Sequence, residues 1–133
     1  MSAPLLELSG LELAYGNSLA VKGIDLAVPE DAVVTLIGAN GAGKTTTVRA
    51  ISGLLRPRAG SIRFGGREIS RLPPHRIAAA GIVQVPEGRQ LFAGLSVAEN
   101  LRLGAFLLPR GAELLRRRDA VLARFPRLKE RLD

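Results

Sequence analysis

Residues 33–46 constrain the fold more than any other part of this 133-residue sequence. They begin with VVTLI, an apolar and largely β-branched run that is typical of a strand buried on both faces of a parallel sheet. The glycine-rich segment GANGAGKTT follows directly, and apolar residues then recur at helical spacing until Pro57. This order predicts a strand, a tight loop and a helix.

The loop itself predicts a phosphate-binding site. Gly38 and Gly43, followed by Lys44 and Thr45, match the pattern of two glycines placed before Lys and Ser/Thr. Glycines let the backbone wrap closely round a phosphate, so that several N–H groups and the start of the helix point inward. Lys44 is expected to reach the β- and γ-phosphates, and the Thr45 hydroxyl to coordinate Mg²⁺.

Two other interpretations of the same loop are weaker. A plain glycine-rich turn at the start of a helix is one alternative, but the apolar strand expected before the loop and the helix after it are the context that the phosphate-binding pattern requires. The dinucleotide-binding pattern fails because its third glycine would fall on Thr46. A nucleoside triphosphate site is therefore the prediction.

Composition removes most catalytic chemistries. The chain has no Cys and one His, which excludes thiolate chemistry and clustered histidine metal sites. The single histidine, His75, is expected at the surface. A hydrophobic fraction of 47% argues against disorder. The N-terminus lacks the basic start of a secretory signal, and no apolar run reaches the roughly 20 residues of a membrane helix. A cytoplasmic location is expected.

Periodicity outlines the remaining elements. Alternating residues predict strands over residues 5–14 and 19–28, and a short strand is expected over 61–64. Helices are expected over 74–80, 97–108 and 111–125, the second of them opened by a capping box of Ser96 and Glu99. Strands alternating with helices indicate an α/β fold, a sheet layered with helices.

The motifs together resemble a known family. The phosphate loop, GIVQVPEGRQLF, LSVAEN and FPRLKERL follow one another as in the ATP-binding subunits of ABC transporters, in particular the branched-chain amino acid uptake subfamily. The resemblance implies a P-loop NTPase-type layered sheet with N-terminal antiparallel strands. Residues 1–95 would form the core sheet and P-loop, and residues 96–133 the start of a helical subdomain.

The same resemblance implies partners and a location. It points to an ATP-driven importer in which two such subunits, alike or different, enclose two ATP molecules with Mg²⁺. They would lie beneath a pair of membrane-spanning permease subunits, on the inner face of the cell membrane. Arg89, Phe92 and Leu95 would then lie near those membrane subunits.

Site residues carry over one by one. Tyr15 falls where an aromatic ring stacks on adenine, although a strand-edge tyrosine with a wet hydroxyl is an equal alternative. Thr46 would face the α-phosphate. The ATP-binding residues of the loop are Gly38, Asn40, Gly41, Ala42, Gly43, Lys44, Thr45 and Thr46.

A second metal contact is expected from Glu87. It falls at the loop that couples the metal site to the membrane subunits, where the superfamily usually has Gln and this subfamily has Glu. Gln84, three residues earlier, is expected on a strand. The alternative for Glu87 is an ordinary solvated loop acid.

In the family, a Leu-Ser-Gly-Gly signature, an acid-terminated strand and a switch histidine follow the segments present here. The resemblance therefore assigns no catalytic residue to these 133 residues, which are expected to bind Mg·ATP weakly and to hydrolyse it hardly at all. The absent strand would also leave VVTLI with an unpaired edge, so a marginal, aggregation-prone chain is expected.

Three alternatives stay open. The subunit could serve another cargo, such as urea or an amide. The chain could be a truncated, non-catalytic nucleotide-binding module that docks on a transporter or a full-length subunit. Its net charge of +7 could also indicate a nucleic-acid-binding domain. Nucleic acid is not expected, because aromatic residues make up only 4% of the chain and the arginines near its end fit a solvated helix face.

Overall fold

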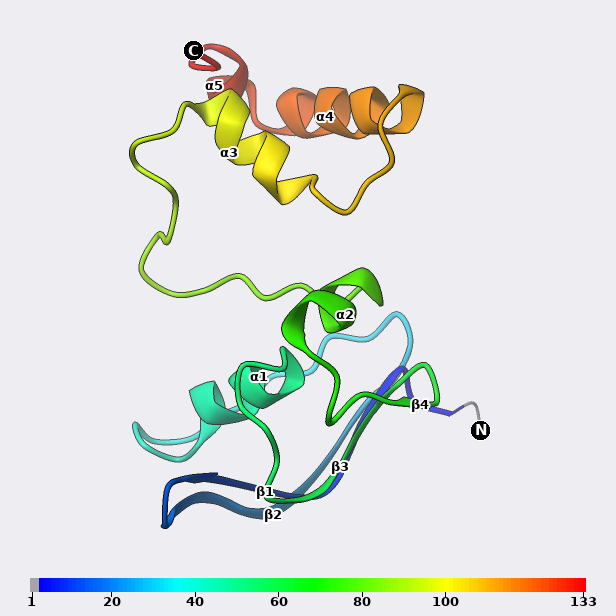
Figure 1. Cartoon of the computed structure of the whole chain (residues 1–133), viewed down its shortest axis with the longest axis vertical. Helices are drawn as coiled ribbons and strands as arrows, with labels where there is room; N and C mark the ends of the chain where they lie inside the picture. Colours follow the sequence, from blue (N-terminus) through cyan, green and yellow to red (C-terminus); the bar gives the residue numbers. More distant parts are fainter. Residues whose placement is uncertain (1–2) are drawn as a thin grey trace. The chain divides into compact units, whose positions relative to one another are not determined.

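The computed structural model describes residues 3–133, which divide into two compact units (Figure 1). The first unit runs to Gln84 and the second runs from Val85 to Asp133. The first contains a sheet with two helices, and the second contains helices joined by loops. The α/β fold expected from the sequence is confirmed.

The sheet of the first unit has four antiparallel strands. They are β1 (Leu6–Tyr15), β2 (Ser18–Val28), β3 (Ala59–Phe64) and β4 (Arg67–Glu68), in the spatial order β2-β1-β3-β4. β1 and β2 form a long hairpin in which Tyr15 lies opposite Ser18. The alternation of apolar and polar residues in the sequence predicted β1 and β2, and the short strand expected over 61–64 lies within β3.

A bulge in β1 adjusts which side chains face the core. Leu8 lies opposite Leu26 and Leu11 opposite Ile24, so two residues of β1 are accommodated against one of β2. Leu8 and Leu11 are both buried, although an odd spacing would place them on opposite faces of a regular strand. The backbone N–H of Gly10 is held by the Asp25 carboxylate at 2.7 Å.

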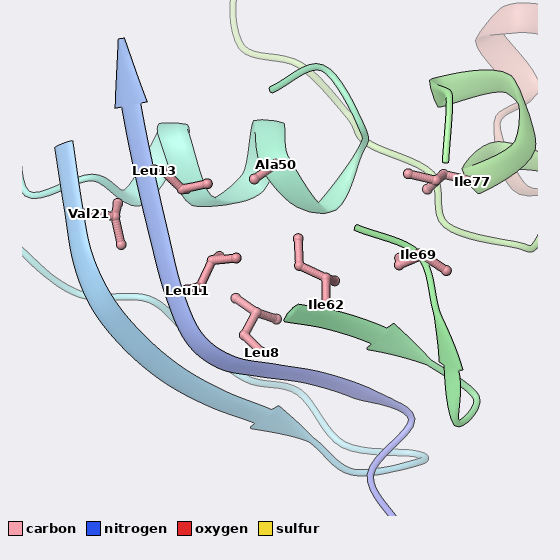
Figure 2. Packing of buried hydrophobic residues seen from close by; sticks show 8 residues of the cluster. All are labelled: Leu8, Leu11, Leu13, Val21, Ala50, Ile62, Ile69 and Ile77. Carbon is pink, nitrogen blue, oxygen red and sulfur yellow. The ribbon is translucent and has the colours of Figure 1, made fainter. Parts of the chain in front are cut away.

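Two helices pack with this sheet round one apolar core. α1 (Lys44–Ile51) and α2 (Pro74–Ala79) contribute Ala50 and Ile77, and the strands contribute most of the rest (Figure 2). Gly53 follows α1 with a φ of +76°, and a Cβ there would lie 2.7 Å from Cδ1 of Ile77. A glycine is therefore required where α1 ends against α2. The buried core residues are Leu8, Leu11, Leu13, Val21, Ala50, Ile62, Ile69 and Ile77.

The second unit contains α3 (Val97–Gly104), α4 (Ala112–Arg124) and α5 (Pro126–Lys129). The capping box predicted at the start of α3 is confirmed: Ser96 and Glu99 each accept a hydrogen bond from the other's backbone N–H. The predicted helix over 97–108 ends earlier, at Gly104. Near the chain end, the N–H of Ala98 donates to the carbonyl of Leu132 at 3.0 Å and ties that segment to α3.

The expectation of a buried strand at VVTLI was wrong. Residues 32–39 form no strand, and Val33 and Ile37 are 97% and 92% exposed. Gln84, also expected on a strand, lies in a segment without regular structure. A buried parallel strand needs hydrogen-bonded neighbours on its edges and helices on both faces, and residues 3–133 provide no paired strand for either segment.

Candidate functional site: the phosphate loop

The predicted phosphate loop, residues 38–46, lies at the start of α1 and is held by the β1–β2 hairpin. Gly43 precedes α1 with a φ of +91°, in the left-handed region that glycine adopts readily. A Cβ at this position would lie 2.6 Å from Cγ2 of Val21 and 3.1 Å from the carbonyl oxygen of Ala20. Glycine therefore satisfies two requirements here, the backbone angle and the close contact with β2.

The first turn of α1 offers unpaired hydrogen-bond donors. Within residues 3–133, the backbone N–H groups of Lys44, Thr45 and Thr46 have no hydrogen-bond partner, because α1 begins only at Lys44 and Gly43 supplies no capping side chain. The first intrahelical bond of this turn runs from the N–H of Thr47 to the carbonyl of Gly43 at 2.8 Å. Such open N–H groups, together with the positive end of the helix dipole, form an anion-binding site.

Lys44 folds back across this loop. Its Nζ donates to the carbonyl oxygens of Gly38 at 2.5 Å and Ala39 at 2.8 Å. The ammonium group is thereby held over the loop, and among residues 3–133 its partners are two neutral carbonyls and no carboxylate. A polyphosphate chain could replace these carbonyls with charge-assisted hydrogen bonds, which are stronger.

The three threonines of the loop and helix have different surroundings. Thr45 is exposed, and its hydroxyl makes no hydrogen bond in the described part of the chain. Thr46 is half-buried. The Thr47 side chain is buried and donates to the carbonyl of Gly43 at 2.8 Å, so its role is structural. Thr45 alone therefore offers an exposed, unused hydroxyl beside the helix start.

The remaining loop residues include two glycines, a turn and an exposed tip. A Cβ on Gly38 would lie 3.1 Å from Cβ of Ala42 and would crowd the inside of the loop. Gly41 has a φ of +84°, and Asn40 is exposed at the tip. The N–H of Ala42 donates to the carbonyl of Ala39 at 3.1 Å and closes a turn within the loop. These features fit a phosphate group with Mg²⁺ beside Thr45.

Tyr15 lies at the hairpin end that also reaches the loop. It ends β1 opposite Ser18, and the next residues of β2, Ala20 and Val21, contact Gly43. Its side chain is 46% exposed, which leaves the ring accessible for stacking. Stacking on adenine stays a prediction.

Glu87, the second expected metal contact, belongs to the other unit. It lies in the loop before α3, is exposed, and makes no hydrogen bond or ion pair among the described residues. Residues 3–133 contain no group of three His, Cys, Asp or Glu side chains arranged to hold a metal ion. His75 is exposed, as expected.

The sequence did not reveal the role of Asn100. Its side chain bonds both backbone groups of Phe92 at 3.1 Å and donates to the carbonyls of Leu95 and Ser96 at 3.3 and 3.0 Å. It thereby fixes the loop that carries the exposed Phe92 and Leu95. The one available signal was its position, four residues after the N-cap Ser96.

The arginines of α4 are largely paired within their own helix. Glu113 accepts from both Arg116 and Arg117, the latter at 2.6 Å, and Arg118 lies 3.2 Å from Asp119. All three arginines are exposed. This arrangement supports the solvated helix face expected from the sequence.

Comparison with known proteins agrees with this fold. A family model described as ABC transporter matches residues 21–132. The branched-chain amino acid transport ATP-binding protein BraF of Pseudomonas aeruginosa is 46% identical over 101 residues, which are 76% of this chain and 40% of BraF. BraG of the same organism is 42% identical over 119 residues, covering 90% of this chain and 51% of BraG. LivG of Escherichia coli is 39% identical over 101 residues, which are 76% of this chain and 40% of LivG.

Solved structures show the same fold. A structure described as the ATP binding subunit of an ABC transporter superposes with a TM-score of 0.82 at 34% identity, covering 96% of this chain and 52% of the other. The structure of CbiO1 from Clostridium perfringens superposes with a TM-score of 0.75 at 28% identity, covering 92% of this chain and 51% of CbiO1. The fold is thus that of an ATP-binding cassette.

The chain belongs to the ABC transporter family, and its curated relatives include branched-chain amino acid transport ATP-binding proteins. It spans about half or less of the length of the relatives above, 40% of BraF and 51% of BraG. Among the described residues, no helix has the length and apolar character to cross a membrane.

Proposed function

We propose that this chain binds Mg·ATP through residues 38–46 as the N-terminal part of the ATP-binding subunit of an ABC importer. The observation that carries the proposal is the convergence at the start of α1 of one ammonium group and three backbone N–H groups that have no partner in the described part of the chain. This cluster of donors, to which no carboxylate of residues 3–133 is bonded, suits a triphosphate.

Each group has a separate part in binding. Lys44 would exchange its two backbone carbonyls for the β- and γ-phosphates, while the N–H groups of Lys44, Thr45 and Thr46 would hold the phosphate oxygens. Mg²⁺ would be held by the Thr45 hydroxyl together with phosphate oxygens and water. The ion would supply charge neutralisation of the polyphosphate. Tyr15 would stack on the adenine, and Glu87 would be a second protein contact of the metal.

The cargo and the partners follow from the relatives. BraF, BraG and LivG are named for high-affinity transport of branched-chain amino acids, so we assign the same cargo class to the transporter containing this chain. Its partners would be membrane-spanning permease subunits and a second ATP-binding subunit. The chain would lie at the inner membrane face, and the exposed Phe92 and Leu95 would lie near the permease.

In this proposal, ATP hydrolysis is carried out by the assembled transporter. The loop of residues 38–46 positions phosphates and metal, but a base or water-orienting group is needed as well. Residues 1–133 alone would therefore bind Mg·ATP and turn it over slowly.

The test is nucleotide binding with and without the Lys44 ammonium group. Lys44→Ala should weaken Mg·ATP binding by about tenfold or more, because charge-assisted contacts to two phosphates are lost. Lys129→Ala, on α5, is the matched control and should leave the affinity unchanged. Calorimetric or dialysis binding that is equal in wild type and Lys44→Ala would refute the proposal.

A further inference from the structure

A cavity of about 450 Å³ lies in the first unit, outside the phosphate loop. Its walls come from the segment that joins α1 to β3 and from β4 with the residues that follow it. The lining residues are Arg56, Pro57, Arg58, Ala59, Gly60, Glu68, Ser70 and Arg71. None of them belongs to residues 38–46, so the cavity is separate from the proposed ATP site.

The neutral and acidic polar groups of this cavity already have partners. Ser70 Oγ accepts from the N–H of Ile62 at 2.7 Å and donates to Glu68. The other carboxylate oxygen of Glu68 lies 3.6 Å from Nε of Arg63, a residue outside the cavity lining. The carboxylate among the lining residues therefore has a hydrogen-bond donor, Ser70, and an exposed ion pair with Arg63, which is a weak interaction.

The three arginines of the cavity are different. Within residues 3–133, the side chains of Arg56, Arg58 and Arg71 make no hydrogen bond and no ion pair. The lining residues therefore include three guanidinium groups and one carboxylate, an excess of two positive charges within the lining itself. The contrast with α4, whose arginines pair with Glu113 and Asp119, shows that this chain pairs exposed arginines where carboxylates are close.

We infer that this cavity binds a phosphate monoester dianion. Guanidinium groups present forked N–H donors that match phosphate oxygens, and a dianion balances the excess of two charges. The cavity lies within the roughly 300–1,000 Å³ of small-molecule sites, so it has room for the organic part of an ester beside the phosphate. The phosphate group could belong to a soluble metabolite or to a lipid headgroup.

The experiment is an NMR titration at low protein concentration with glycerol phosphate, performed on the Lys44→Ala background as well as on wild type. The expected result is a saturable shift of the Ala59 and Gly60 amides in both proteins. Arg58→Gln combined with Arg71→Gln should weaken this binding by about tenfold or more, because two sets of charge-assisted bonds are lost. Arg76→Gln, an exposed arginine on α2 outside the cavity, should have no effect.

A second arm distinguishes the source of the phosphate. Flotation with vesicles containing phosphatidic acid, against vesicles of neutral lipid alone, measures binding to a membrane-borne monoester. Arginine-dependent binding in either arm supports the site and identifies its source. Circular dichroism of each variant confirms folding, and the single variants Arg58→Gln and Arg71→Gln are used if the double variant unfolds.

Three outcomes would overturn the inference. One is the absence of a shift at Ala59 and Gly60 together with no arginine-dependent vesicle binding. Another is binding that disappears with Lys44→Ala, which would assign the anion to the phosphate loop. The third is an affinity that the Arg58 and Arg71 substitutions leave unchanged in folded protein. Only the second of these concerns the ATP site, so the two proposals fail independently.

Discussion

Thr45 and Thr47 are two residues apart on α1, yet their hydroxyl groups have opposite surroundings. Thr47 is 2% exposed and its hydroxyl is bonded to the carbonyl of Gly43. Thr45 is exposed and its hydroxyl makes no bond in the described residues. Residue type alone therefore does not separate a ligand-binding threonine from a structural one; the helical position does, because successive positions turn about 100° round the axis.

This difference predicts opposite effects of the same substitution. Thr45→Val should leave the melting temperature nearly unchanged and weaken nucleotide binding only when Mg²⁺ is present, because the lost hydroxyl is a metal ligand in our proposal. Thr47→Val should lower the free energy of unfolding by about 1 kcal/mol through the lost buried hydrogen bond, with little effect of Mg²⁺ on affinity.

Titrations of ATP with and without Mg²⁺, together with thermal melts of both variants, check this prediction. An equal loss of Mg²⁺-dependent binding in the two variants would contradict the assignment of Thr45.

At the scale of single elements, the bulge in β1 depends on a close backbone contact with β3. A Cβ on Gly60 would lie 2.3 Å from the carbonyl oxygen of Gly10 and 2.5 Å from that of Ser9. These are backbone atoms, so no side chain can move aside to relieve the clash. The strands themselves would have to separate.

Gly60→Ala should therefore destabilise the first unit by more than the cost of placing alanine at a positive φ, because the clash with β1 adds to that cost. Gly65→Ala is the matched control: Gly65 also has a positive φ, +54°, but a Cβ there would meet nothing within 4 Å. We expect about 1 kcal/mol for Gly65→Ala and clearly more for Gly60→Ala, measured by denaturant unfolding. Equal losses in the two variants would show that β1 and β3 move apart without cost.

The start of α3 offers a second prediction for an element. Ser96→Ala should lower the stability of α3 by about 1 kcal/mol, because the N–H of Glu99 loses its acceptor. Ser96→Asp keeps a side-chain acceptor for this N–H and should retain most of the stability of α3. Hydrogen exchange at the Glu99 amide measures the effect locally, and unchanged protection in Ser96→Ala would contradict it.

The elements that the sequence predicted correctly are those whose signals are local. Alternation located β1 and β2, the pair Ser96 and Glu99 located α3, and the spacing of two glycines before Lys44 located the candidate loop. Asn100 was missed because its four bonds reach backward into an irregular loop, and no periodic pattern marks such a residue. The contact of Gly43 with Val21 was missed for a related reason: it joins residues from two different elements.

At the scale of the molecule, several large apolar side chains remain in contact with solvent in each unit. Val33 and Ile37 are the clearest in the first unit. In the second unit Val85 and Phe106 are 90% and 82% exposed. The sequence predicted burial for residues 33–37 because apolar side chains favour contact with other apolar groups. Burial also requires neighbouring strands and helices to pack against them, and a local sequence pattern does not show whether such neighbours are present.

The exposed segment predicts self-association of the 133-residue chain. Sedimentation should show a mass that rises with concentration, because unpaired backbone groups beside apolar side chains favour intermolecular pairing. Val33→Lys combined with Ile37→Lys should reduce it, whereas Ala27→Lys, at an exposed position of β2, should not. A monodisperse wild-type monomer with a sharp thermal melt at micromolar concentration would contradict the prediction.

The contact between Gly43 and β2 joins the candidate phosphate-binding loop to the β1–β2 hairpin, whose role is structural. Side chains alternate along β2, so sliding that strand by one position would bring the neighbouring Lys22 toward the loop in place of the Val21 methyl group. An added cation there would change the electrostatic potential felt by any incoming anion. A change in the register of β1 against β2 should thus alter the affinity of the loop for its ligand, even if no backbone atom of the hairpin contacts the ligand.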